Sequence, residues 1–565
     1  MAHYYHLSNR PQKLEPHHVE GAHRQAVTEL KAAEAAQDAK AFLKALRRWN
    51  DWEAYLSGEY ARVGYELAKN TAHEPTVLAE KYFREKIIPV SSKAGFEIGS
   101  LLLASKLRSE LISEMGEYFF KKADVQLMTS DPKNVDLRVL EGGIVKEYEQ
   151  FVARAEVTVQ GQKMTLTKAR SLGTSENADL RRDSFFAYRK WFVDHHAELS
   201  GFFARLVENR QKQAENLGHS NYLKLGYAGM SRTDYGQAES KQFRSNVERL
   251  IVPLVKKLRE AQAKELGTPL VHAWDASFTP SLRFPDDAAP VATQLDCADQ
   301  IFGRLSPVLQ GHFRKMRQEN LIDLENRPGK RAGAFCTSFP DEKRVAIFCN
   351  STGSHSDVGT LMHEMGHAFQ AWESQGIEWV EMRWPTLDAA EIHSMGMEYL
   401  SLRHMDVFFK GDLKNKFKKE KFKDALELLC HIAVVDEFQH WVYENPKVSP
   451  SDRDDAWCRI FDRFQPGWDF SQFPEAKWAR WYAQSHIYAA PFYYIDYGIA
   501  EMGAMQLAML EERDATQALS SYLALCRLGG QKSVLDIFKS AGLESPFQES
   551  LVQKLADYAQ NAIRA

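Results

Sequence analysis

Residues 361–369 read LMHEMGHAF, an H-E-x-x-H pattern set in an apolar run. Helical residues four apart lie on the same face, so His363 and His367 would present two imidazoles about one turn apart. Two imidazoles so placed can share one metal ion, and imidazole suits zinc. Glu364 directly follows the first histidine and is placed to accept a proton from a metal-bound water. The stretch therefore predicts a zinc-bearing helix.

The flanking sequence supports this helix over a chance match of five letters. Ser354 and Asp357 have the S-x-x-D form of a helix start. Apolar residues then recur at helical spacing from Val358 onward. Gly366 falls inside the helix, where glycine costs about 1 kcal/mol against alanine. We therefore expect another part of the chain to approach the helix closely at Gly366.

A catalytic zinc needs a third protein ligand and one open position. A second helix, beginning near Thr386 or Asp388, offers Glu391, which lies 24 residues after His367. That interval is long enough for the first helix to end and the chain to return, so we predict Glu391 as the third ligand. His393 is the rival ligand, but it lies about 160° round the helix from Glu391.

Two further carboxylates are candidates for orienting the ligands. Glu391, Ser394 and Glu398 share one face of the second helix, at i, i+3 and i+7. We expect Glu398 or Asp388 to accept a hydrogen bond from the second N–H of a ligand imidazole. The alternative for Glu398 is a surface carboxylate with no role at the metal.

The pairing of HEMGH with EIHSMGME resembles the thimet oligopeptidase and oligoendopeptidase F family of zinc peptidases, including its oligoendopeptidase F-like and Pz-peptidase-like members. The resemblance extends roughly from Ala155 to the C-terminus. It implies two helical halves around a deep substrate channel, one Zn²⁺ per chain, and short peptides as substrates. It also implies hydrolysis of internal peptide bonds, with Glu364 as the general base.

A second element of that family is matched between His486 and Tyr497, where one histidine and four tyrosines fall within twelve residues. The resemblance implies that His486 and Tyr497, then Tyr493 or Tyr494, donate hydrogen bonds to the oxyanion of the reaction. The alternative is an aromatic core, and we assign Tyr488 to packing.

A glycine-bearing loop and a short strand precede the zinc motif. The segment 327–335 lacks the glycine spacing of a phosphate-binding loop. Its end, Gly333, Ala334 and Phe335, resembles a family element near the bound peptide. Residues 344–350 have the composition of a short strand.

The rest of the chain is rich in helix-forming residues, which predicts a mainly α protein with a small β-sheet beside the zinc helix. Alternating residues predict a β-hairpin near 155–167. We expect an N-terminal helical domain at 1–190, containing this hairpin, and a zinc-peptidase catalytic domain at 191–565.

Composition limits the partners and the compartment. The 565 residues are 44% hydrophobic and 26% charged with a net charge of −4, which gives no sign of nucleic acid or an anionic membrane as a partner. Six scattered cysteines, no signal-peptide pattern, and no apolar stretch approaching 18 residues favour a cytoplasmic protein without a membrane segment. The oligomeric state stays open.

The zinc motif has two other interpretations. A structural zinc would need four protein ligands, often cysteines; none is next to the motif, and Glu364 would be superfluous. An aminopeptidase would need an acidic group for the free amine of its substrate. The sequence has many carboxylates, so this second alternative stays open.

Overall fold

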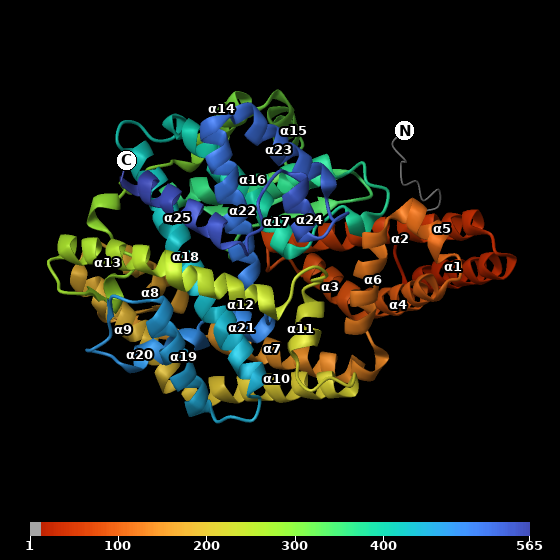
Figure 1. Ribbon diagram of the computed structural model, residues 1–565, viewed down its shortest axis with the longest axis horizontal. Helices are drawn as coiled ribbons and strands as arrows, with labels where there is room; N and C mark the ends of the chain where they lie inside the picture. The colour runs from red at the N-terminus through yellow and green to blue at the C-terminus, as the bar shows by residue number, and fades with distance from the viewer. Residues whose placement is uncertain (1–12, 565) are drawn as a thin grey trace. The chain divides into compact units, whose positions relative to one another are not determined.

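The computed structural model describes residues 13–564, which are mainly α-helical with small β-sheets (Figure 1). This confirms the predicted fold class. The chain forms two compact units, each built from separate segments. Unit 1 comprises the described residues up to Met128, Pro285–Lys414 and Gly503–Leu543; unit 2 comprises Thr129–Phe284, Asn415–Met502 and the residues from Glu544 on. The domain division at residue 190 stays a prediction.

The first part of unit 1 is a helical bundle in which α1 packs against α2 and α4 (Figure 1). The side chain of Asp38 caps α2 by accepting a hydrogen bond from the Ala41 N–H. The aromatic residues Trp49 and Tyr55 of α2 are buried in the core of this bundle. Its helices are α1 (Pro16–Ala36), α2 (Ala39–Lys69), α3 (Glu74–Tyr82), α4 (Ile88–Ala104), α5 (Arg108–Met115) and α6 (Glu117–Thr129).

One helical stretch of the described chain, Glu74–Ala104, is long and apolar enough to cross a membrane by length and composition alone. Its 18-residue window has a mean hydropathy of 1.3, and 22% of that window is buried. The expectation that no apolar stretch approaches 18 residues was therefore wrong. Lys93 and Glu97 interrupt the apolar run, so the sequence shows no long uncharged segment here.

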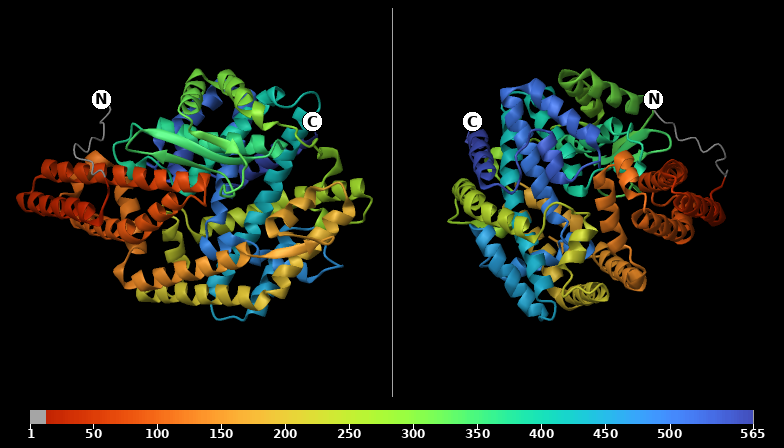
Figure 2. Two further views of the ribbon diagram at one scale, coloured as in Figure 1. Left: turned by 180° about the vertical axis from the view of Figure 1, so that it is seen from behind. Right: turned by 45° about the vertical axis from the view of Figure 1, so that its right-hand side comes forward.

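The small sheet of unit 1 has the strand order β4-β6-β5. The strand predicted at residues 344–350 is β6 (Arg344–Ser351), at the centre of the sheet. It pairs in parallel with β4 (Ile322–Glu325) and antiparallel with the edge strand β5 (Phe335–Phe339). The sheet contacts α16 (His355–Glu373), so it lies beside the predicted zinc helix, as expected (Figure 2).

Helix α16 begins where the sequence predicts, with Ser354 as its N-cap. The Asp357 carboxylate accepts hydrogen bonds from the N–H groups of residues 352, 353 and 354, at 2.7, 2.7 and 3.0 Å. These bonds satisfy backbone donors that a helix start leaves open. The predicted second helix is α17 (Leu387–Ser401), with Thr386 as its N-cap.

The predicted close approach at Gly366 is confirmed, and it is made by α17. A Cβ atom on Gly366 would lie 2.4 Å from the His393 carbonyl oxygen and 2.6 Å from the Ser394 Cα. The Tyr522 hydroxyl donates to the Gly366 and His393 carbonyl oxygens, at 3.3 and 3.1 Å, and so ties the two helices together. The remaining helices of unit 1 are α14 (Val291–Leu305), α15 (Pro307–Gln318), α23 (Ala515–Leu528) and α24 (Val534–Ser540).

Unit 2 contains the hairpin expected near 155–167, with β1 (Glu156–Val159) antiparallel to β2 (Gln162–Thr165). Helices α7 and α10 pack side by side (Figure 1). The other elements are α7 (Val135–Ala153), α8 (Leu166–Ser171), α9 (Ala178–Asp194), α10 (His196–Asn216), α11 (Leu223–Gly229), α12 (Gln237–Asn246), α13 (Val252–Leu266), β3 (Val271–His272), α18 (Leu413–Glu444), α19 (Pro450–Phe464), β7 (Trp468–Asp469), α20 (Glu475–Tyr482), α21 (Ser485–Ala489), α22 (Tyr494–Arg513) and α25 (Glu549–Arg564).

Replacement of Gly366 tests the helix contact. We expect Gly366→Ala to lower the free energy of unfolding by about 1–3 kcal/mol, because the added methyl group meets backbone rather than a flexible side chain. Gly359→Ala is the matched control: it lies in the same helix, and its Cβ would meet nothing within 4 Å. That variant should be stabilised by up to about 1 kcal/mol. Urea unfolding of both variants checks this, and equal shifts would contradict the role of Gly366.

Candidate active site

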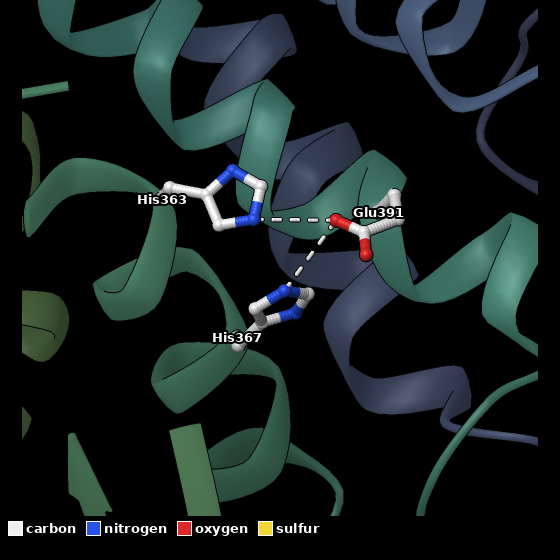
Figure 3. A group of neighbouring side chains, drawn as sticks. All are labelled: His363, His367 and Glu391. Atoms are coloured by element: carbon white, nitrogen blue, oxygen red, sulfur yellow. Dashed lines mark ion pairs between the residues drawn. The ribbon is translucent and has the colours of Figure 1, made fainter. Parts of the chain in front are cut away.

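Two helices bring the three predicted ligands together (Figure 3). His363 and His367 project from α16, and Glu391 projects from α17. The Nε2 atoms of His363 and His367 lie 3.3 and 3.5 Å from the same carboxylate oxygen of Glu391. One ligand atom from each residue lies within 4.8 Å of the other two.

These distances fit a tetrahedral zinc site. Zn–N and Zn–O bonds of about 2.0–2.2 Å place neighbouring ligand atoms about 3.4 Å apart at tetrahedral angles. The distances from the two imidazole nitrogens to the Glu391 oxygen, 3.3 and 3.5 Å, match this separation. The donor set of two imidazoles and one carboxylate is also one that catalytic zinc uses. The residues present therefore fit a zinc ion.

Two side chains of α17 orient this ligand set. Glu398 Oε1 lies 2.8 Å from His363 Nδ1, where it accepts a hydrogen bond and leaves Nε2 facing Glu391. The Ser394 hydroxyl donates to Glu391 Oε2 at 2.9 Å. The contact expected for Glu398 is thus present, and Ser394 fixes the carboxylate of the third ligand.

The electrostatics of the cluster favour a positive charge. Burial opposes protonation of His363, but the carboxylates of Glu391 and Glu398 raise its pKa to about 10. Burial likewise opposes ionisation of Glu391, but hydrogen bonds from His363 and His367 hold its pKa well below the usual range. The same carboxylates would stabilise a metal cation held by the imidazoles.

Glu364 lies on α16 beside the ligands but does not join them. Its side chain is buried, and among the described residues Glu364 Oε2 has no hydrogen-bond partner. Burial raises the pKa of this carboxyl above its usual value. A buried acceptor without a donor is costly unless a ligand or water supplies one. Glu364 is therefore suited to hold a water next to the metal ligands.

Two other polar residues of α17 lie outside the ligand cluster. His393, the rival ligand, is fully buried, and burial lowers its pKa to about 4. Its Nδ1 atom lies 3.3 Å from the Ala390 carbonyl oxygen on its own helix. Asp388 is buried in the first turn of α17, and its role beside a ligand imidazole stays a prediction.

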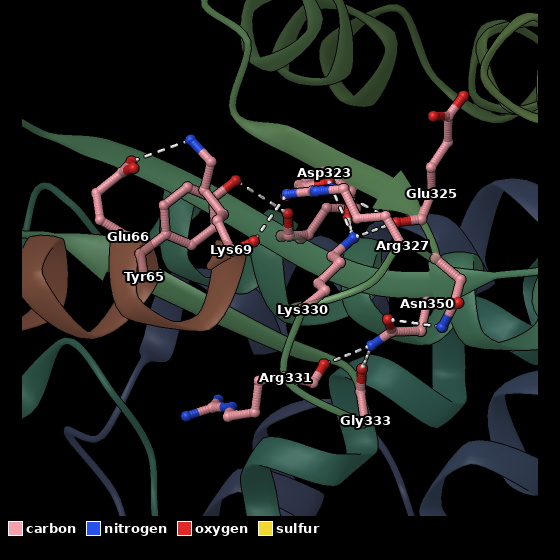
Figure 4. A network of polar contacts seen from close by, with 12 residues as sticks. Tyr65, Glu66, Lys69, Asp323, Glu325, Arg327, Lys330, Arg331, Gly333 and Asn350 are labelled. Atoms are coloured by element: carbon pink, nitrogen blue, oxygen red, sulfur yellow. Dashed lines mark hydrogen bonds and ion pairs between the residues drawn. The ribbon is translucent and has the colours of Figure 1, made fainter. Parts of the chain in front are cut away.

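Gly333, the first of the predicted substrate-binding residues, lies in the loop before the edge strand β5 (Figure 4). Asn350 on β6 donates to the carbonyl oxygens of Arg331 and Gly333, at 2.8 and 2.7 Å, which fixes the loop in front of the strand. Gly333 has a φ of +93°, a conformation that favours glycine. Phe335, which the sequence places in the loop, is the first residue of β5.

The second predicted group belongs to unit 2. The Tyr493 hydroxyl donates to the Tyr497 hydroxyl at 2.9 Å, and the His486 ring lies 5.1–6.1 Å from the rings of Tyr493, Tyr494 and Tyr497. All four side chains keep some exposure. Tyr488 instead is fully buried and stacks on another tyrosine ring at 3.8 Å, as expected for a packing residue.

A strained turn holds this aromatic group in place. Phe492 has a φ of +66°, which is unfavourable for a side chain of its size. Arg232 donates to the Phe492 carbonyl oxygen and to Asp496 Oδ1, the latter at 2.6 Å. Gly226 leaves room for the Phe492 ring, because a Cβ there would lie 2.5 Å from it. The ion pair and the glycine thus stabilise the start of α22.

Gln484 is a residue of this group that sequence reasoning missed. Its Nε2 donates to His486 Nδ1 at 2.8 Å, so a neutral His486 carries its proton on Nε2. Burial lowers the pKa of His486, which favours that neutral form. Gln484 Oε1 lies 3.3 Å from His431 Nε2. Only its position two residues before His486 could have drawn attention to it.

Comparison with known proteins identifies the family of this chain. The profile of peptidase family M3 matches residues 171–557, and that of the peptidase M3 N-terminal domain matches residues 12–130. An oligoendopeptidase F homologue of Borreliella burgdorferi is 19% identical over 479 residues, which cover 77% of this chain and 79% of the relative.

Solved structures of similar proteins match nearly the whole chain. A PZ peptidase A bound to an inhibitor has a TM-score of 0.90 at 32% identity and covers 98% of both chains. A protein described as a putative oligoendopeptidase F has a TM-score of 0.90 at 31% identity, covering 100% of this chain and 99% of the other. Another, from Bacillus anthracis, has a TM-score of 0.85 at 28% identity, covering 100% and 97%.

The contact between His363 and Glu398 predicts how zinc affinity responds to mutation. We expect Glu398→Ala to raise the dissociation constant for zinc about 10–100-fold, because the ligand imidazole loses the acceptor that orients it. Asp388→Ala should change the constant less. Competition with a chromophoric chelator measures both constants. A larger effect at Asp388 would transfer the orienting role to that residue.

Proposed function

Because the chain belongs to peptidase family M3, a family of metallopeptidases, we propose that it is a zinc-dependent endopeptidase acting on short oligopeptides. The observation that carries the proposal is the arrangement of His363, His367 and Glu391 around one point, beside the unpartnered carboxylate oxygen of Glu364. An endopeptidase hydrolyses internal peptide bonds and needs no free terminus on its substrate.

In the proposed mechanism His363, His367 and Glu391 hold one zinc ion per chain. Bound there, zinc would polarise the scissile carbonyl and lower the pKa of a water ligand towards about 7. Glu398 keeps His363 in the tautomer whose Nε2 faces the metal position. Ser394 keeps the Glu391 oxygen in place.

Glu364 acts as the general base. It accepts a proton from the attacking water and later donates that proton to the leaving amine. Its buried side chain and raised pKa suit both steps, since the group must gain and lose a proton in one catalytic cycle. Proton transfer of this kind contributes about 10²–10⁴-fold to a rate.

His486 and Tyr497 are proposed to donate hydrogen bonds to the oxyanion that forms from the attacked carbonyl. Gln484 supports this role for His486, because it leaves the proton on Nε2. The Tyr493 hydroxyl donates to the Tyr497 oxygen, so the Tyr497 hydroxyl proton points to a different acceptor. Tyr494 is the alternative donor to the oxyanion. One lost donor of this kind costs about 10²–10³ in rate.

The substrate backbone is proposed to lie along the loop and strand that begin with Gly333, Ala334 and Phe335. β5 is an edge strand and can pair with an extended peptide by adding one strand to the sheet. Asn350 fixes the loop before any substrate arrives. This arrangement suits a peptide of any sequence, because backbone hydrogen bonds carry the recognition.

We also propose that the enzyme works in the cytoplasm. All six of its cysteines are free thiols, as expected in a reducing compartment. This proposal is independent of the catalytic mechanism.

One experiment separates the proposed endopeptidase from an aminopeptidase and from a protein with a structural zinc. An internally quenched peptide with a blocked N-terminus should be cleaved, inactivated by a chelator, and cleaved again after zinc is restored. We expect Glu364→Gln to keep about one zinc per chain while kcat falls about 10²–10⁴-fold. Cleavage of unblocked peptides alone would indicate an aminopeptidase, and loss of zinc from Glu364→Gln would make Glu364 a ligand.

The oxyanion donors are tested by comparing four tyrosine and histidine variants. Tyr497→Phe and His486→Ala should each cost about 2–4 kcal/mol of transition-state stabilisation, seen as a lower kcat with little change in KM. Tyr488→Phe is the control: its hydroxyl is buried against the Leu199 carbonyl oxygen, so it should change kcat much less. If Tyr494→Phe alone lowers kcat, that tyrosine is the donor; if none of these variants does, the group is packing.

A further inference from the structure

A cavity of about 170 Å³ in unit 2 is lined by three arginines and no acidic residue. Arg170 comes from α8, Arg189 from α9 and Arg480 from α20, helices that lie side by side in Figure 1. Trp274 and Trp468 supply aromatic walls. The chain thus gathers three positive charges at one point from segments up to about 300 residues apart.

The three guanidinium groups lack the carboxylate partners that fully buried arginines of this unit have. Arg210 pairs with Glu141 at 2.7 Å, and Arg232 pairs with Asp496 at 2.6 Å. Within residues 13–564, by contrast, the side chains of the three arginines lining the cavity make no hydrogen bond and no ion pair. Arg189 Nε and Nη1 and Arg480 Nε are buried atoms with unused hydrogens.

Aromatic rings stabilise the charges only in part. The Arg480 guanidinium lies 4.5 Å from the Trp468 ring centre, and that of Arg189 lies 4.9 Å from the Tyr188 ring centre. A ring face attracts the cation but does not satisfy N–H groups in the guanidinium plane. Burial and the neighbouring guanidinium charges lower the pKa of Arg480, and burial lowers that of Arg189 to about 10.

The other polar atoms of the cavity are mostly donors or neutral groups. Trp468 Nε1 is a buried donor without a hydrogen-bond partner. His431 is neutral, because burial and the charge of Arg480 lower its pKa to about 4. The cavity therefore offers several unused donors and a net positive charge, which is the environment an anion requires.

We propose that this cavity binds a small oxyanion, held by the guanidinium groups of Arg170, Arg189 and Arg480. The volume corresponds to about five or six water molecules. It accommodates phosphate or one carboxylate but not a nucleotide. Two sources share this chemistry: a free anion such as inorganic phosphate, and the C-terminal carboxylate of a peptide.

The cavity has a direct connection to the group around His486. Gln484 lines the cavity, lies 3.3 Å from His431 and donates to His486 Nδ1 at 2.8 Å. An anion held beside His431 would therefore lie close to the hydrogen bonds that set the tautomer of His486. The anion site itself does not depend on the proposed peptidase function.

Thermal unfolding in phosphate tests the site without measuring activity. For the parent protein in HEPES buffer we expect phosphate to raise the unfolding midpoint by about 1–3 °C in a saturable way, since a ligand bound only by the folded state stabilises it. Arg189→Met and Arg480→Met should lose most of this response. Both should also unfold at a higher temperature than the parent when phosphate is absent, because one unpaired buried charge is gone.

Two further variants make the test decisive. Arg154→Met removes an exposed arginine from the same unit and should keep the full phosphate response. Arg170→Gln changes an exposed position and should weaken phosphate binding at least 10-fold by calorimetry, whether or not Arg189→Met and Arg480→Met fold. No saturable response in the parent, or an unchanged response in all three cavity variants, would overturn the proposal.

Peptide kinetics then distinguish the two sources. If the site takes a peptide carboxylate, phosphate will raise KM for free-acid peptides but not for their C-terminal amides, and Arg170→Gln will remove the difference between them. If the site takes a free anion, phosphate will leave the ratio of the two KM values unchanged. Failure of the proposed peptidase function would abolish cleavage but leave the phosphate response in unfolding intact, so the two failures are distinguishable.

Discussion

The three proposed metal ligands can meet only because α16 and α17 touch through their backbones. Two ligands come from one helix and the third from the other, so the separation of the helices sets the distance between imidazole and carboxylate. Gly366 permits this separation, since any Cβ would lie 2.4 Å from the His393 carbonyl oxygen. Tyr522 bonds carbonyl oxygens on both helices and keeps the contact in register. The spacing of the proposed ligands thus follows from the way in which the two helices pack.

The parts of this site that could be predicted from the sequence are those encoded over short distances. The four-residue spacing of His363 and His367 places both side chains on one helix face. The seven-residue spacing of Glu391 and Glu398 does the same on the next helix. A glycine in the middle of a helix signals a close contact, although the sequence does not say with what. Strand β6 and the start of α16 follow from local composition and capping residues. Each of these signals lies within about ten residues, where backbone periodicity determines which side chains share a face.

Features that escaped prediction depend on contacts between distant segments. The chain passes between its two units several times, so each unit is assembled from segments that lie far apart in the sequence. Gln484 contacts His431, which lies more than fifty residues earlier in the sequence, and this contact helps to position it. The cluster of Arg170, Arg189 and Arg480 has no signal in the sequence, since each arginine alone is typical of a helix surface. The apolar stretch within Glu74–Ala104 was missed for a different reason, namely the charges inside it.

Charge balance offers one criterion for recognising both sites. In unit 1 the carboxylates of Glu391 and Glu398 lie next to the imidazole of His363 and raise its pKa, so this cluster favours a positive charge. In unit 2 the three guanidinium groups lining the cavity have no carboxylate at all. Buried charges that serve only the fold, such as Arg232 and Asp496, balance each other within the chain. Where the charges that line a cavity are not balanced within the chain, a ligand of the opposite charge can neutralise them. The sign of the imbalance fits both proposals: a cation beside Glu391 and an anion beside Arg480.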